Sequence, residues 1–286
     1  MSKNEFKKLL ITYMKEHYFE DYEIGVTYSS VNNEAGHECI SVRRKEDVSI
    51  VTIGVSSLYE VYKSDGCSFS EITDKIMSYY DEFINITDMT GIGKKDFLFE
   101  NVYCRLVNYE MNKKLLQRVP HERRLDMAVI YFMRFSLSEN ENAGVIIDYD
   151  RFVGKEDEEL LKESAWENTM RDEPAVVCPL SDIVGSAGND DAPVYIVSNI
   201  DKYYGAVCIY YPELLKMVAE ELGSDLYILP SSIHECLVIP TYLFTDSEGL
   251  KKMVHDVNRG ELKRHEILSD SVYYYNLKKD CISIDN

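Results

Sequence analysis

The amino-acid sequence predicts an α+β fold with a mostly antiparallel or mixed β-sheet and a smaller N-terminal α+β part. The main observation is that an apolar hairpin is followed by a helix three times in the second part of the chain. Helices that follow hairpins must cover one face of the sheet, which is typical of α+β proteins. A glycine-bearing stretch, Thr90–Lys95, separates this part from an earlier set of helices and strands. We therefore expect an N-terminal subdomain over residues 1–92 and a C-terminal domain over residues 93–286.

Two serine–glutamate pairs mark the starts of helices in the N-terminal part. Ser2 and Glu5 have the spacing of a capping box, as do Ser68 and Glu71. Apolar residues recur at helical intervals behind each pair. They are Phe6, Leu9, Leu10, Tyr13 and Met14 in the first helix, and Ile72, Ile76, Tyr79, Tyr80 and Phe83 in the second. Between the boxes we expect three strands and a further helix, with the strands at Tyr22–Ser30, Cys39–Arg43 and Val48–Gly54.

The C-terminal part is expected to contain three units of a hairpin and a helix. The hairpins are Met127–Phe135 with Gly144–Tyr149, Val194–Ser198 with Ala206–Tyr211, and Leu226–Leu229 with Cys236–Ile239. The helices are Asp157–Met170, Glu213–Leu222 and Glu248–Val257. Pro212 and Gly223 bound the middle helix, as proline and glycine commonly do. The last helix is expected to bury one apolar stripe, formed by Leu250, Met253, Val254 and Val257. The tail is expected to add edge strands at Val272–Tyr275 and Cys281–Ile284.

Composition and charge restrict the class of protein. The chain has 286 residues, of which 45% are hydrophobic and 28% charged, as in a soluble globular protein. Its 50 acidic and 31 basic residues give a formal net charge of −19, which repels nucleic-acid phosphates and anionic membranes. Direct nucleic-acid binding and membrane association are therefore not expected. An acidic protein can also mimic nucleic acid, and that alternative stays open.

Cysteine usage indicates a cytoplasmic protein. The seven cysteines are widely spaced, without a CxxC or zinc-finger pattern. Most lie in apolar runs, as Cys208 and Cys236 do, where a free thiol packs as a small hydrophobic group. This usage fits a reducing cytoplasm better than secretion. The N-terminal segment alternates charged and apolar side chains, unlike a signal peptide, and no segment approaches the ~20 apolar residues that span a bilayer.

The most specific stretch is Leu226–Pro240, in which two apolar runs flank the polar turn PSSIHE. Hydroxyl, imidazole and carboxylate groups cluster in this turn, and the candidate catalytic residues are Ser231, Ser232, His234 and Glu235. If the segment is extended, Ser232 and His234 share one face, whereas the other two candidates share the opposite face. A hydrolase would need the Ser232 hydroxyl beside His234 and a carboxylate from elsewhere to orient the ring.

A structural interpretation of this turn is favoured over catalysis. Turn serines commonly bond backbone groups, and the turn lacks the GxSxG elbow that exposes a nucleophile. A metal held by His234 and Glu235 is a weaker alternative, because HExxH is absent. A second such dipeptide, His265-Glu266, lies in a charged stretch that is typical of a solvated surface, and His17, His37 and His121 have no companions at ligand spacing. No cofactor is expected, since Gly91–Lys95 departs from a Walker loop and GxGxxG does not occur.

The tyrosine content suggests a second candidate site. There are 22 tyrosines, and several are adjacent in the sequence. Strand propensity and packing explain most of these pairs. Exposed tyrosine is nevertheless favoured at binding surfaces, because it offers a large contact area and a hydroxyl. Tyr203 and Tyr204, followed by Gly205 between two expected strands, are therefore the candidate binding residues.

A set of stretches in this sequence is similar to one bacterial family. They are VNYEMNKKLLQRVP (107–120), LDMAVIYF (125–132), Ala165–Asn168, VYIVSN with GAVCIYY, DLYILPSSIHECLVIP, and MVHDVN with LSDSVYYY. They resemble a family common in gut Firmicutes that is classified as a domain of unknown function, family 5688. The resemblance covers most of the chain after about Leu98, and LPSSIHE is its most specific string. It implies a bacterial cytoplasmic protein and no particular chemistry.

The leading functional hypothesis is a cytoplasmic bacterial protein that binds another protein, or serves as an accessory protein, without catalysis. It follows from the absence of a complete catalytic or cofactor motif together with tyrosine-rich strands and an acidic composition. The first alternative is a hydrolase-like enzyme with its site at the Ser231–Glu235 turn. The second alternative is the acidic nucleic-acid mimic. The expected partner is therefore another protein.

Overall fold

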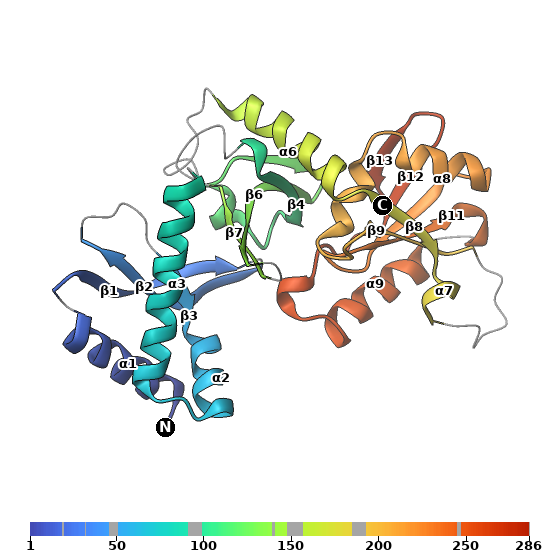
Figure 1. Ribbon diagram of the computed structural model, residues 1–286. Helices are drawn as coiled ribbons and strands as arrows, with labels where there is room; N and C mark the ends of the chain where they lie inside the picture. The colour runs from blue at the N-terminus through green and yellow to red at the C-terminus, as the bar shows by residue number, and fades with distance from the viewer. Residues whose placement is uncertain are drawn as a thin grey trace. The chain divides into compact units, whose positions relative to one another are not determined.

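The computed structural model describes residues 1–18, 20–31, 33–45, 51–90, 99–138, 141–147, 157–184, 193–244 and 247–285 (Figure 1). The chain divides into two compact units, Met1–Phe97 with Ser136–Ala143, and Leu98–Phe135 with Gly144–Asn286. Strands in three antiparallel sheets are combined with helices, which confirms the predicted α+β fold. The predicted boundary between residues 92 and 93 lies outside the described residues, as does the Gly91–Lys95 stretch.

The N-terminal unit packs three helices against one face of a three-stranded sheet (Figure 1). The helices are α1 (Lys3–Tyr18), α2 (Val55–Asp65) and α3 (Phe69–Thr90). The strands, in the order β1-β2-β3, are Tyr22–Val31, Glu34–Arg44 and Val51–Gly54. The shared core consists of Phe6, Leu10, Met14, Ile24, Ile40, Val42, Val55, Leu58, Ile72, Ile76, Met77 and Tyr80. The predicted order of helices and strands in this part is confirmed.

Both predicted capping boxes form. The Ser2 and Ser68 hydroxyls each accept a hydrogen bond of 3.3 Å from the backbone N–H of the glutamate three residues on. Glu5 and Glu71 each accept one of 2.8 Å from the serine N–H, and these bonds lower the pKa of both carboxyls. Leu9 and Tyr79, predicted on the buried stripes, are exposed instead, because they lie at the edges of those stripes.

The C-terminal unit contains two sheets. In the first, the strand order is β4-β6-β5, and β7 also pairs with β6. In the second, the order is β13-β12-β10-β11-β9-β8, so the C-terminal strands form one edge as predicted. Strands β4 to β7 are Val102–Asn108, His121–Arg124, Met127–Ser138 and Glu141–Ile146, and the adjoining ends of β6 and β7 within Ser136–Ala143 belong to the N-terminal unit. Strands β8 to β13 are Ala175–Pro179, Tyr195–Asn199, Leu226–Pro230, Cys236–Pro240, Tyr273–Asn276 and Cys281–Ile284.

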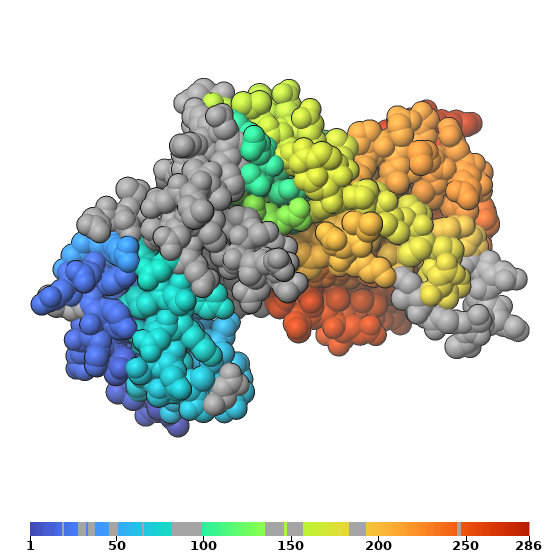
Figure 2. Space-filling view, in the orientation of Figure 1, coloured from blue at the N-terminus to red at the C-terminus, as the bar shows by residue number. Residues whose placement is uncertain are grey.

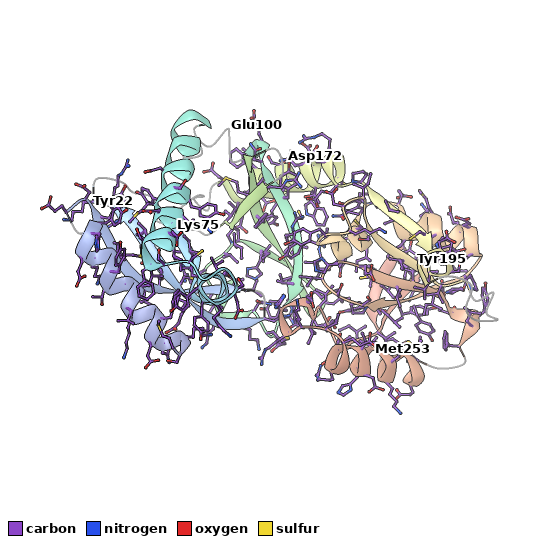
Figure 3. The ribbon with its side chains drawn as sticks, turned by 60° about the horizontal axis from the view of Figure 1, so that its bottom comes forward. Tyr22, Lys75, Glu100, Asp172, Tyr195 and Met253 are labelled. Atoms are coloured by element: carbon purple, nitrogen blue, oxygen red, sulfur yellow. The ribbon has the colours of Figure 1, made fainter. Side chains whose placement is uncertain are left out.

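The helices of this unit connect its strands. They are α5 (Lys113–Leu116), α6 (Glu158–Asp172), α7 (Ser181–Val184), α8 (Leu214–Leu222) and α9 (Glu248–Gly260), with short 3-10 helices η2 (Gly205–Tyr210), η3 (Thr241–Leu243) and η4 (Arg264–Glu266). Figure 2 shows α6, α8 and α9 at the surface of the unit. Figure 3 marks Asp172 at the end of α6, Tyr195 at the start of β9 and Met253 on α9. Among the described residues, none of the helices combines the length and apolarity that a bilayer crossing requires.

One predicted strand is a helix. Ala206–Tyr211 was expected to pair with the strand that begins near Val194, but most of it forms η2. Both edges of β9 are already paired, with β8 on one side and β11 on the other, so no place is left for another strand. Tyr204, with a φ of 56°, turns the chain into η2 instead. The prediction of a hairpin at this position is therefore wrong.

Helix α9 covers one face of the six-stranded sheet. Its Leu250 and Val254 pack in a cluster with Leu229, Ile239 and Val272 of the sheet region. The prediction that Met253 belongs to the same buried stripe is wrong, since 48% of this residue is exposed. Met253 follows Leu250 by less than one full turn, which rotates it away from the sheet.

These two residues of α9 give a matched test of the packing. Leu250→Ala is expected to lower the free energy of unfolding by about 2–5 kcal/mol, because Leu250 is 0% exposed and its removal leaves a cavity. Met253→Ala, on the same helix, is expected to change it by about 0.5 kcal/mol or less. Urea unfolding followed by circular dichroism measures both changes, and equal effects of the two substitutions would refute the packing described here.

Candidate functional site

The turn Ser231–Glu235 joins two neighbouring antiparallel strands, as predicted. Strands β10 and β11 pair along their length, and Pro230 lies opposite Cys236 at the end next to the turn. Within the turn, Ser232 Oγ accepts a hydrogen bond of 3.0 Å from the His234 N–H. Ser231 Oγ donates one of 3.3 Å to Glu235 Oε1. The two serine hydroxyls therefore make bonds that close the turn itself.

Three other elements hold the backbone of the turn from outside. The Ile233 N–H donates to the Glu266 carbonyl of η4 at 2.9 Å, and the Ile233 carbonyl accepts from the Ala206 N–H of η2 at 3.3 Å. Ser198 Oγ, at the end of β9, donates to the His234 carbonyl at 2.8 Å. Because strands and helices far apart in sequence all bond to it, the turn has a single well-defined geometry.

His234 brings the two predicted sites together. Its Nδ1 accepts a hydrogen bond of 3.1 Å from the Tyr204 N–H. The centroid of its ring lies 5.3 Å from that of Tyr203 and 5.5 Å from that of Tyr204. The two tyrosine rings meet edge to face, with centroids 4.6 Å apart. The residues selected separately for their chemistry and for their aromatic character thus belong to one cluster, which we call the His–Tyr cluster (Tyr203, Tyr204 and His234).

The protonation state of His234 follows from its surroundings. Burial lowers the pKa of the imidazole from its ordinary value of 6.5; the nearby carboxylates of Glu266 and Glu235 act in the opposite direction, and His265 adds a smaller lowering effect. The ring is therefore neutral at pH 7, and its Nδ1 lone pair accepts the Tyr204 N–H. In the neutral ring the proton then resides on Nε2.

A buried ion pair lies beneath the cluster. Glu173, at the end of α6, receives two hydrogen bonds from the Arg105 guanidinium of β4, at 2.8 and 2.9 Å. The Arg105 and Glu173 side chains are only 5% and 2% exposed. Arg134 of β6 adds a bond of 3.1 Å to the same carboxylate. Two parallel N–H to O bonds in a buried setting are a strong and strongly oriented contact.

The ion pair is connected to the cluster through Asn199. Its side-chain amide donates to Glu173 Oε2 at 3.2 Å and to the Tyr203 carbonyl at 2.9 Å, and its Oδ1 accepts the Tyr203 N–H at 3.1 Å. The Arg105 guanidinium also lies over the Tyr204 ring, 5.2 Å from its centroid. The Asn199 amide thus holds the Tyr203 backbone, and the Arg105 guanidinium packs against the Tyr204 ring.

The loop that carries the tyrosines has exposed side chains, and its backbone is held by bonds to Asn199 and His234. Ile200 and Tyr203 are each 59% exposed. Lys202 and Tyr204 adopt φ values of 53° and 56°, a left-handed conformation that costs about 1–2 kcal/mol for each residue other than glycine. The contacts with Asn199 and His234 offset that cost. We call residues 200–204 the aromatic loop.

Gly205 permits the close approach of the aromatic loop to β9. A Cβ atom at this position would lie 2.3 Å from Ser198 Oγ, 2.4 Å from the Asn199 backbone N and 2.8 Å from the His234 carbonyl oxygen. Two of these three atoms belong to the backbone, so they cannot move aside. Only glycine fits where the loop, the strand and the turn meet.

The arrangement does not form a serine–histidine pair among the contacts described. Ser232 Oγ accepts from a backbone N–H, and His234 Nδ1 does the same. The two buried thiols nearby are poor nucleophiles, because burial raises the pKa of Cys208 to about 12 and also raises that of Cys236. No group of three or more His, Cys, Asp or Glu side chains in the described part of the chain could hold a metal ion.

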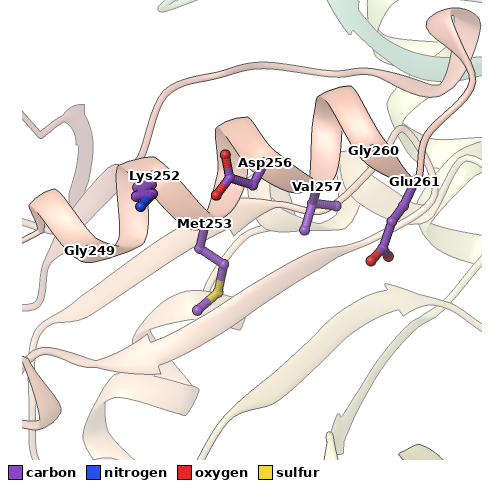
Figure 4. Close-up of a pocket in the computed structure, with 7 residues that line it drawn as sticks. All are labelled: Gly249, Lys252, Met253, Asp256, Val257, Gly260 and Glu261. Carbon is purple, nitrogen blue, oxygen red and sulfur yellow. The ribbon is translucent and has the colours of Figure 1, made fainter.

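A surface depression lies elsewhere in the unit, along α9 (Figure 4). It has a volume of about 600 Å³ and is lined by one face of the helix, between Gly249 and Glu261. Its lining includes the exposed Met253 and the charged side chains of Lys252 and Asp256. None of the candidate catalytic or binding residues lines it. It contributes no group to the His–Tyr cluster.

The structure is therefore an α+β protein in which an exposed tyrosine loop is held by hydrogen bonds above a buried ion pair. The chain belongs to the family of unknown function DUF5688, whose family model matches residues 3–277. No curated protein and no solved structure matches the chain.

Several residues of the site were not predicted from the sequence. They are Arg105, Arg134, Glu173, Ser198, Asn199 and Ile200. Ser198 and Asn199 end an apolar strand directly before the aromatic loop, and that position could have indicated a role in supporting it. Arg105 and Glu173 are too far apart in the sequence for spacing to suggest a pair, and Arg105 lies between apolar residues of β4.

Two glycines provide a matched test of the packing around the site. Gly205→Ala is expected to destabilise the protein by roughly 2–5 kcal/mol, because overlap with fixed backbone atoms forces β9, η2 and the turn apart. Gly249→Ala in α9 meets no atom within 4 Å and is expected to be neutral or stabilising by up to about 1 kcal/mol. Thermal and urea unfolding compare the two variants, and a stable Gly205→Ala protein would contradict the geometry of the site.

Proposed function

We propose that this chain is a bacterial cytoplasmic protein that binds another protein, without catalysis, through the aromatic loop. The single observation that carries the proposal is that Tyr203 is 59% exposed while its backbone N–H and carbonyl both bond the Asn199 side chain. Binding hot spots are enriched in tyrosine, and a residue that is already ordered loses little conformational entropy when a partner arrives. The aromatic loop therefore fits the role of an anchor for a protein surface.

Ile200 extends this surface. It is as exposed as Tyr203 and lies on the same short loop. The backbone of this loop is strained at Lys202 and Tyr204. Two exposed large apolar side chains on such a loop are typical of a binding surface. A partner with a shallow apolar recess would bury both residues. The acidic composition of the chain, with a net charge of −19, would disfavour nucleic acid as the partner.

The geometry of the PSSIHE turn supports binding over hydrolysis. The hydroxyl of Ser232 and the Nδ1 of His234 accept bonds from backbone N–H groups, and both bonds shape the turn and the aromatic loop. In this proposal Ser231, Ser232, His234 and Glu235 support the tyrosines, and catalysis is not their role. The bacterial and cytoplasmic assignment rests on the family resemblance and on the cysteine usage.

The test is affinity capture from a lysate of the source bacterium with matched tyrosine variants. The wild-type protein is expected to retain a specific partner, whose dissociation constant is then measured with purified components by calorimetry. Tyr203→Ala is expected to weaken binding by roughly 30-fold, since a hot-spot side chain contributes about 2 kcal/mol. Tyr242→Ala serves as the control, because Tyr242 is 63% exposed but lies on η3, outside the aromatic loop.

The control is expected to bind as tightly as the wild type. Circular dichroism and thermal unfolding establish that Tyr203→Ala remains folded. Failure of the wild-type protein to retain any partner would count against a binding function. Equal dissociation constants for Tyr203→Ala and Tyr242→Ala would place the binding surface elsewhere.

A further inference from the structure

The contact between His234 and the aromatic loop depends on an unprotonated ring nitrogen. Nδ1 of His234 accepts the Tyr204 N–H at 3.1 Å, and a nitrogen that carries a proton cannot accept a hydrogen bond. Tyr204 has a φ of 56°, so its backbone needs this bond to hold a conformation that it would not adopt alone. The imidazole is also half-buried against the rings of Tyr203 and Tyr204.

We propose that protonation of His234 favours release of the aromatic loop, so that a larger fraction of the protein presents its binding surface while the imidazole is neutral. In the cationic ring both nitrogens are donors, and the Tyr204 N–H would then face another N–H. The regulation rests on the proposed function in one respect, namely that the aromatic loop is the surface that a partner contacts. The release itself is a property of the chain alone.

The charged and titratable groups at or next to the ring come from the turn, η4, the aromatic loop and β4. Glu235 belongs to the same turn, while His265 and Glu266 lie on η4. Tyr203 and Tyr204 face the ring from the aromatic loop, and the Arg105 guanidinium lies over the Tyr204 ring. The two carboxylates favour the imidazolium, whereas burial and His265 disfavour it, and burial is the largest effect.

The direction of the pH dependence follows from these effects. Burial lowers the pKa of His234 in the closed site below its ordinary value of 6.5, so a released loop binds a proton more readily than a closed one. The closed state is therefore fully favoured above pH 6.5 and loses stability as the pH falls below that value. One proton shifts the ratio of closed to released loop by at most about tenfold for each pH unit. The loss stops once the closed site is also protonated.

Hydrogen exchange of the Tyr204 amide in the full-length protein tests this directly. Exchange is followed by NMR at about pH 7.5 and about pH 5.5 and corrected for the intrinsic rate at each pH. The protection of the Tyr204 amide is expected to fall several-fold, and by at most about tenfold, at the lower pH. Amides of the β10–β11 ladder are expected to keep theirs, which separates release of the loop from global acid unfolding.

Three variants identify the titrating group. His234→Asn places a non-titrating carbonyl oxygen the same number of bonds from the Cβ atom as Nδ1, so the amide is expected to stay protected at both pH values. His234→Gln moves the carbonyl one bond further out, and protection is expected to be low at both. His265→Gln removes the neighbouring imidazole and is expected to keep the pH dependence of the wild type.

The switch and the binding surface fail in different ways. Equal protection of the Tyr204 amide in the wild type at both pH values would overturn the switch, as would a His234→Asn variant that keeps the wild-type pH dependence. Neither result involves a partner, so the proposed binding function would be untouched. Wild-type binding by Tyr203→Ala would instead overturn the proposed surface and leave the release of the loop standing.

Discussion

Arg105 and Glu173 meet in the interior of the C-terminal unit as a bidentate ion pair, and the geometry of the site depends on this contact. Glu173 ends α6, Arg105 lies in the middle of β4, and the same carboxylate also accepts from Arg134 and Asn199. The Glu173 carbonyl accepts from the Tyr211 hydroxyl at 2.9 Å. One residue therefore ties both sheets, a helix end and the segment after η2 together. Removing one partner of such a pair leaves an uncompensated charge and costs about 3–5 kcal/mol.

The use of polar contacts explains why the aromatic loop has one conformation. Apolar packing is tolerant of small shifts, whereas a bidentate pair and an amide that bonds both sides of one residue specify direction as well as distance. Two sets of contacts connect the ion pair to the loop. Glu173 bonds Asn199, which bonds the backbone of Tyr203, and Arg105 lies over the ring of Tyr204, whose backbone N–H bonds His234. The turn is bonded to the same strand, because the Ser198 hydroxyl of β9 donates to the His234 carbonyl. The exposed Tyr203 is therefore held in place through its backbone by the Asn199 side chain.

Local signals in the sequence predicted much of this structure. The capping boxes at Ser2 and Ser68 form because their bonds involve residues three positions apart. The turn between β10 and β11 was predictable because apolar runs that each end at a proline flank a polar stretch. The sequence indicated Tyr203 and the turn residue His234 as two separate candidates, and no local pattern indicated that their rings lie 5.3 Å apart.

What could not be predicted depends on contacts between distant parts of the chain. The aromatic loop meets the turn only because β11 lies between β10 and β9, an order that no local pattern reveals. The same order explains the wrong expectation for Ala206–Tyr211, since β9 had no free edge to offer. Glu173 looks like an ordinary helix-terminal glutamate followed by proline, and nothing near it indicates that its charge is buried against Arg105.

The buried ion pair is expected to hold the aromatic loop rigid. Backbone order parameters of residues 200–204, measured by NMR relaxation, test it most directly in the wild type and in Glu173→Gln, with Glu159→Gln, an exposed ion-pair partner on α6, as the control. We predict values near 0.85 for the loop in the wild type and the control, equal to those of rigid backbone, and clearly lower values in Glu173→Gln. Loop values below about 0.6 in the wild type, or an unchanged loop in Glu173→Gln, would contradict the claim.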